Sequence, residues 1–145
     1  MKAEDLMIGD LVYYSYANQY AAKVIDVCGH GEEPFIRCKR DERDELYKLN
    51  QFEDFHVGIL RPIPLTIEIL KKNGYVYNEM RDVWELIPNN GYGVCCNDDG
   101  TFEFCLGVFD GYHGDIIYHY IADVEYVHKL QHMLKDCKIE KEIIV

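Results

Sequence analysis

The sequence predicts an α+β protein with two parts, a small β unit followed by a mixed unit that has two helices. Twelve Tyr and six Phe, with many Val and Ile, weight the composition towards strands. Helix patterns are confined to about 66–73 and 124–136, and the first begins at Thr66 and ends at Asn73-Gly74. We therefore expect residues 1–61 to form one unit and residues 62–145 the other, packed together as one compact protein.

The first 61 residues alternate short strand patterns with turns. Aromatic and β-branched runs at 11–14, 23–27 and 35–39 are typical of strands. Two glycines and a proline at 29–34 predict a loop between the second and third of these strands. Four or five short strands in about sixty residues fit a small SH3-like β-barrel or a strongly bent sheet.

Residues 62–145 predict an antiparallel sheet accompanied by the two helices. The strand patterns follow the first helix, at 75–77, 83–86, 92–96, 101–106 and 115–120. Asn97-Asp98-Asp99-Gly100 predicts a hairpin turn, and 107–114 is interpreted as a loop. Asp123 is expected to cap the second helix, and 138–145 to form an edge strand.

Composition and charge exclude several classes of function. The net charge of −11 argues against a nucleic-acid partner, because phosphate binding needs a surplus of Lys and Arg. No run of 18 apolar residues is present, so we expect no membrane span. Because no apolar leader precedes the first strand, the six cysteines are interpreted as reduced thiols in a cytoplasmic protein.

The strongest metal-site candidate is the set Glu125, His128 and His132. Offsets of three and seven place these side chains on one face of a helix. Their order differs from the His-Glu-x-x-His arrangement of zinc proteases. The alternative is that His128 bonds to a neighbouring strand while His132 faces solvent. A metal-dependent hydrolase is therefore a further alternative rather than the leading interpretation, and the sequence predicts no cofactor.

Cysteines offer a second metal candidate. Cys95, Cys96 and Cys105 can be combined with His113 or His119, but adjacent cysteines do not make the Cys-x-x-Cys turn of a zinc ribbon. We interpret them as half-buried strand thiols.

Tyrosines and cations suggest binding. Exposed Tyr favours protein or ring-shaped ligands, whereas the alternative places alternate rings at the core edge with their hydroxyls in water. Cations at 37–43 can hold an anion such as a nucleotide phosphate, although neighbouring acids favour a self-neutralising loop. The candidate ligand-binding residues are Tyr14, Tyr16, Tyr20, Arg37 and Arg40, and Tyr112, Tyr118 and Tyr120 mark the later strands.

Three motifs lie in order along the chain: Met1-Lys2-Ala3-Glu4-Asp5-Leu6 with Ile8-Gly9-Asp10, then Pro62-Ile63-Pro64-Leu65-Thr66 with Asn73-Gly74-Tyr75, and late Val127-His128-x-Leu130-Gln131. Together they resemble a family of short proteins, without an assigned activity, encoded by phages and mobile elements of gut bacteria. The resemblance implies a mobile-element setting in a bacterial host cell and no particular reaction.

These observations favour a non-catalytic binding or adaptor protein that acts on a host or phage protein in the bacterial cytoplasm. The main alternative is a small-molecule binder that sequesters a nucleotide in anti-defence. A protein partner is expected, a small-molecule ligand is the alternative, nucleic acid and membrane are not expected, and a homo-oligomer is compatible with the sequence.

Overall fold

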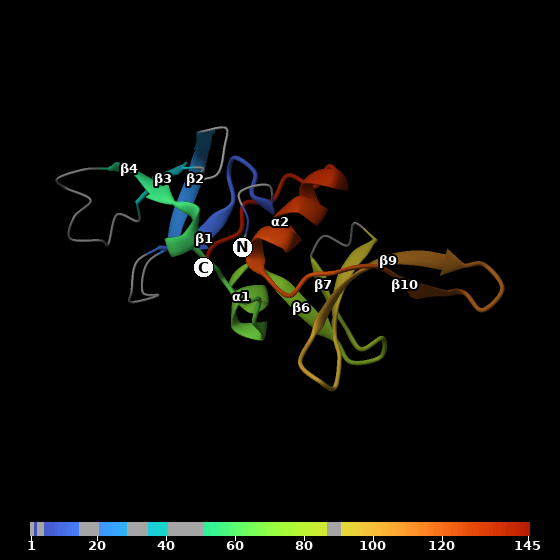
Figure 1. Ribbon diagram of the computed structural model, residues 1–145. Helices are drawn as coiled ribbons and strands as arrows, with labels where there is room; N and C mark the ends of the chain where they lie inside the picture. The colour runs from blue at the N-terminus through green and yellow to red at the C-terminus, as the bar shows by residue number, and fades with distance from the viewer. Residues whose placement is uncertain (1, 3–4, 15–20, 29–34, 41–50, 87–90) are drawn as a thin grey trace. The chain divides into compact units, whose positions relative to one another are not determined.

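The computed structural model describes residues 2, 5–14, 21–28, 35–40, 51–86 and 91–145 (Figure 1). The chain divides into two compact units, Met1–Ile63 and Pro64–Val145. This division falls after Ile63, whereas the sequence placed the boundary after residue 61. Each unit contains one antiparallel sheet, and each is described by itself below.

Unit 1 is a five-stranded antiparallel sheet with the strand order β4-β3-β2-β1-β5. Its strands are β1 (Leu11–Tyr13), β2 (Ala21–Cys28), β3 (Phe35–Lys39), β4 (Phe52–His56) and β5 (Arg61–Pro62). A single 3-10 turn, Val57–Ile59, connects β4 to β5. Within the described strands, β4 and β5 are the two edges and do not pair with each other. The sequence also suggests a strand at 46–49, but these residues lie outside the described ones.

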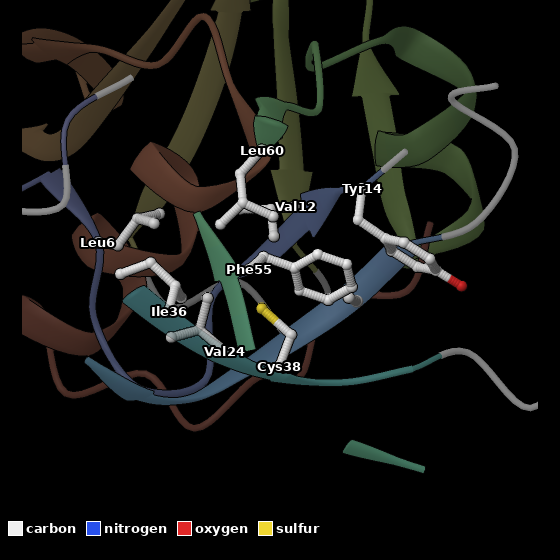
Figure 2. Packing of buried hydrophobic residues seen from close by; sticks show 9 residues of the cluster. Leu6, Val12, Tyr14, Val24, Ile36, Cys38, Phe55 and Leu60 are labelled. Atoms are coloured by element: carbon white, nitrogen blue, oxygen red, sulfur yellow. The ribbon is translucent and has the colours of Figure 1, made fainter. Parts of the chain in front are cut away.

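The core of unit 1 forms because alternate residues of its strands point to one face. Val12, Val24 and Ile36 come from three neighbouring strands and are fully buried. Phe55 of β4 and Leu60, just before β5, pack against them (Figure 2). The same cluster includes Leu6, Tyr14, Ala22 and Cys38.

Unit 2 is a meander of five antiparallel strands in the order β10-β9-β8-β7-β6. They are β6 (Tyr75–Asn78), β7 (Val83–Leu86), β8 (Tyr92–Cys96), β9 (Phe102–Asp110) and β10 (Asp115–Asp123), with helices α1 (Ile67–Lys72) and α2 (Val127–Asp136). Val94 of β8 lies opposite Phe104 of β9, and both are fully buried. With these helices, the described part of the chain is mostly β and confirms the predicted α+β class.

Helix α1 begins and ends as its sequence predicts. The Ile69 N–H donates to Thr66 Oγ1 at 3.3 Å, so Thr66 is the N-cap. Asn73 is the C-cap, and Gly74 follows with a φ of 79°, a conformation that favours glycine.

Helix α2 begins at Val127 rather than at the predicted residue 124. Asp123, the expected cap, is the last residue of β10. The Val124 N–H donates to the Phe102 carbonyl, and the Leu65 N–H donates to the Glu125 carbonyl, each at 2.9 Å. These long-range bonds keep the backbone extended up to Tyr126, so the helix starts three residues later than the apolar stripe suggests.

The C-terminal segment, residues 138–145, is not the edge strand expected from its pattern, because the structure assigns no strand there. The Asn73 side chain holds it instead. Asn73 Nδ2 donates to the Ile144 carbonyl at 2.7 Å, and the Ile144 N–H donates to Asn73 Oδ1 at 2.8 Å. Ile143 is thereby kept in the core, at 2 % exposure.

No helix in the described part of the chain has the length and apolar character needed to cross a membrane.

Candidate functional site

The most distinctive surface lies on the hairpin of β9 and β10. Both strands are nine residues long, although the sequence predicted a loop from 107. Strand β8 pairs with β9 from Phe102 to Leu106, and beyond these residues β9 and β10 continue as a pair (Figure 1). Among the described strands, no third one pairs with them there. We call residues 107–121 of this hairpin the outer hairpin.

Both faces of the outer hairpin are apolar. Val108 lies opposite Ile117, and Phe109 lies opposite Ile116. Directly opposed residues share a face, whereas successive residues alternate, so the two pairs occupy opposite faces. Phe109 is 67 % exposed and Tyr112 in the turn is 91 % exposed. The other large exposed apolar residues of the outer hairpin are Val108, Ile117, Tyr120 and Ile121.

Charge on the hairpin is acidic. Residues 102–123 contain two Asp at the hairpin tip, one Glu and a further Asp, and no Lys or Arg. A hydrogen bond from His113 Nδ1 lowers the pKa of Asp110, and hydrogen bonds from Arg81 lower the pKa of Asp115. Both carboxylates are therefore ionised at neutral pH.

Tyr118 anchors the hairpin to the rest of the sheet. Its ring lies across the backbone of two glycines: a Cβ added at Gly107 or at Gly93 would lie 3.1 Å from the ring. The Tyr118 hydroxyl donates to Glu85 Oε1 on β7 at 2.7 Å. Burial raises the pKa of the Tyr118 hydroxyl, and so does this bond to the carboxylate.

The network around Glu85 joins the hairpin to the rest of the sheet. Glu85 accepts hydrogen bonds from Tyr118, Asn78 and Arg81. Burial raises its pKa, but the three donors outweigh burial and the net pKa is lowered. Arg81 also binds Asp115 at 2.7 Å. These contacts join β10 to β7 and to the turn that carries Arg81.

The predicted ligand-binding residues of unit 1 do not form one open site. Tyr14 is buried, with its ring 5.1 Å from that of Phe55. Arg40 is buried as well, lies 5.4 Å above the Tyr14 ring and forms an ion pair with Glu53. Tyr16 and Tyr20 lie outside the described residues.

Arg37 lines an open cleft on the same sheet. The cleft has a volume of about 520 Å³, and its described lining is Ile25, Arg37, Phe52, Glu53 and Asp54. The Arg37 guanidinium donates two hydrogen bonds to Asp54, at 2.7 and 2.8 Å. The bond from Arg37 lowers the pKa of Asp54, which is therefore ionised. An anion entering the cleft must compete with that carboxylate.

The predicted metal ligands are not assembled around one point. Glu125 precedes α2 and lies 3.6 Å from the ammonium of Lys129. His128 is buried and stacks on Tyr126, while its ring centroid lies 5.8 Å from that of His132. Within the described residues, no group of three His, Cys, Asp or Glu side chains is arranged to hold a metal ion.

Sequence reasoning selected Tyr112, Tyr118 and Tyr120 from the hairpin but missed Phe109 and Ile117. Gly107 is the reason for Phe109, since a glycine inside an apolar run suggests a loop. Ile117 lies in the strand expected at 115–120, but no role was assigned to it. One signal in the sequence could have predicted the long hairpin. Two apolar runs of similar length lie on either side of 111–114, and neither contains Lys or Arg.

Comparisons of this chain with protein-family models, curated proteins and solved structures found no match. The resemblance to the phage and mobile-element family therefore stays a prediction. The function has to be inferred from the surfaces described above.

Proposed function

We propose that the chain is a non-catalytic protein-binding module that contacts its partner through the outer hairpin. The observation that carries this proposal is the exposure of large apolar side chains on both faces of one two-stranded element. Contiguous exposed apolar surface marks interaction sites, and aromatic residues are enriched in the centres of interfaces.

The edge position of β10 among the described strands determines what kind of partner fits. β10 is an edge strand, and Asp115–Asp123 contains no Lys and no Pro, the residues that usually prevent an edge from pairing. An extended segment of another protein can add to such an edge by backbone hydrogen bonds. Because the hairpin and the whole chain are acidic, the matching segment alternates apolar with basic residues.

The setting of the proposal is a phage or mobile-element adaptor that acts on a host or phage protein in the bacterial cytoplasm. The proposal also takes unit 1 as an SH3-like barrel. The barrel interpretation is supported by the strand order β4-β3-β2-β1-β5 and by the 3-10 turn Val57–Ile59 just before the last strand. Contact between the β4 and β5 edges would close such a barrel.

Affinity capture from a lysate of the bacterium that encodes the chain tests the proposal. The variant Phe109→Ser/Ile117→Ser removes one apolar side chain from each face of the outer hairpin. Met80→Ser is the matched control, because Met80 is 95 % exposed and lies in another turn of unit 2. We expect a protein retained by the wild type and by Met80→Ser but not by the double variant. Equal retention by all three, or no specific retention, contradicts the proposal.

A small-molecule binder is the second candidate, and the cleft beside Arg37 is the observation that favours it. A nucleotide phosphate would have to displace Asp54 from Arg37. A thermal-shift panel of nucleotides tests this, since a ligand at a hundredfold over its dissociation constant adds about 2.7 kcal/mol of stability. A shift that disappears in Arg37→Ala supports the cleft, whereas no shift across the panel removes this candidate. No arrangement among the described residues favours the metal-dependent hydrolase.

A further inference from the structure

Two cysteines meet on the face of the sheet that carries Tyr118. The Sγ atoms of Cys95 on β8 and Cys105 on β9 lie 3.2 Å apart. In the strand register, Cys105 lies opposite Gly93, and Cys95 lies opposite Glu103. The two cysteines are therefore diagonal neighbours on one face.

We propose that Cys95 and Cys105 are a redox modification site, at which a peroxide oxidises the two thiols to a disulfide joining β8 to β9. A disulfide bond is about 2.05 Å long, so the two sulfur atoms have to approach by little more than 1 Å. The bond would close the hairpin that turns at Asn97–Gly100. Cys95 and Cys105 lie outside residues 107–121, and their oxidation does not depend on the proposed binding function.

The two thiols have different roles. The two thiols share one hydrogen bond, in which either sulfur can be the donor. This bond lowers the pKa of Cys105 and raises that of Cys95. Cys105 therefore holds the negative charge when the pair loses a proton, and the thiolate is the reactive form of a cysteine. Burial raises the pKa of Cys38 in unit 1 to about 12, which makes Cys38 an internal comparison.

The chemistry balances with peroxide as the oxidant. The Cys105 thiolate attacks one peroxide oxygen, the O–O bond breaks, and the products are a sulfenic acid and hydroxide, which takes up a proton to become water. Cys95 sulfur then attacks the sulfenic sulfur, the S–O bond breaks, and that oxygen leaves as water with the Cys95 proton. Two thiols lose two electrons and one peroxide becomes two waters. Cys105 is 3 % exposed, so a small oxidant suits this site.

Peroxide treatment of the reduced, full-length protein tests the site. After alkylation of the remaining thiols, peptide mapping should show a Cys95–Cys105 disulfide and the loss of two of the six thiols. Cys38 should stay reduced, and dithiothreitol should restore both lost thiols. The proposal is overturned if Cys95 and Cys105 are alkylated as fully as Cys96 and Cys137 after the same dose.

Single variants separate this pair from general cysteine oxidation. Cys95→Ser should abolish the disulfide and leave Cys105 as a sulfenic acid that a dimedone probe labels. Cys96→Ser is the matched control, because Cys96 is the next residue on β8 and points to the other face. It should form the disulfide at the wild-type rate. Loss of the disulfide in Cys96→Ser, or its persistence in Cys95→Ser, contradicts the assignment.

Discussion

Asn73 shows how much one buried polar residue can determine. The sequence predicts it as the end of α1, and its backbone confirms that role. Its side chain does more, because it donates to the Ile69 and Ile144 carbonyls and accepts from the Ile144 N–H. An amide is suited to this position because it can donate and accept at once.

Replacing Asn73 should therefore destabilise unit 2. Asn73→Ala leaves three backbone groups without their side-chain partner, and we expect a loss of roughly 3 kcal/mol in the free energy of unfolding. Lys141→Ala, an exposed change in the same C-terminal segment, should change stability by less than about 0.5 kcal/mol. Chemical denaturation measures both. Equal effects of the two variants would show that the Asn73 side chain does not hold the segment.

Glu85 should make stability depend on pH. Its folded pKa is below its ordinary value of 4.5, so its contribution to stability is present above that value and is lost as pH falls through the folded pKa. We expect Glu85→Gln to be less stable than the wild type at neutral pH, and the difference between them to shrink below about pH 4.5. Denaturant titrations of both proteins across this range measure it. A difference that stays constant down to about pH 3 would mean that ionised Glu85 is not held by its three donors.

At the scale of elements, the β9–β10 hairpin depends on two glycines that leave room for the Tyr118 ring. A Cβ at Gly93 would lie 2.5 Å from Val83 Cγ2 and 3.1 Å from the Tyr118 ring. Neither glycine has a positive φ in the structure, so space rather than backbone conformation excludes a side chain.

Gly93→Ala should cost about 1–3 kcal/mol in the free energy of unfolding, because the added carbon forces Val83 and Tyr118 apart. The matched control is Gly111→Ala in the hairpin turn, where an added Cβ meets no atom within 4 Å. Thermal unfolding should show a lower midpoint for Gly93→Ala alone. If both variants unfold at the wild-type temperature, the packing of Tyr118 does not depend on a glycine at position 93.

Local signals in the sequence predicted the elements whose ends are fixed locally. Thr66, Asn73-Gly74 and the turn at Asn97–Gly100 act through neighbouring backbone groups, and the structure confirms them. The predicted start of α2 was wrong because hydrogen bonds to distant residues keep 124–126 extended. The outer hairpin was missed for the same kind of reason. Gly107 lies inside a strand because the Tyr118 ring covers it, and Tyr118 is distant in the sequence. The candidate site therefore depended on contacts that no short window of sequence contains.

For the whole molecule, charge should govern the choice of partner. A chain of net charge −11 lacks the cation surplus that phosphate backbones require. We expect no saturable binding of duplex DNA at about 0.15 M salt, measured by the fluorescence anisotropy of a labelled duplex. Saturable binding that weakens steeply with added salt would contradict the exclusion of nucleic acid.

The most direct test of the central claim is site-specific photo-crosslinking. An aromatic photo-crosslinking amino acid replaces Phe109 on the outer hairpin in one protein and Phe52 beside the unit 1 cleft in another; both side chains are exposed. After irradiation in cells of the organism that encodes the chain, we predict a discrete protein adduct from position 109 and none from position 52. An adduct from position 52 alone, or from neither position, would contradict the assignment of the hairpin as the binding surface.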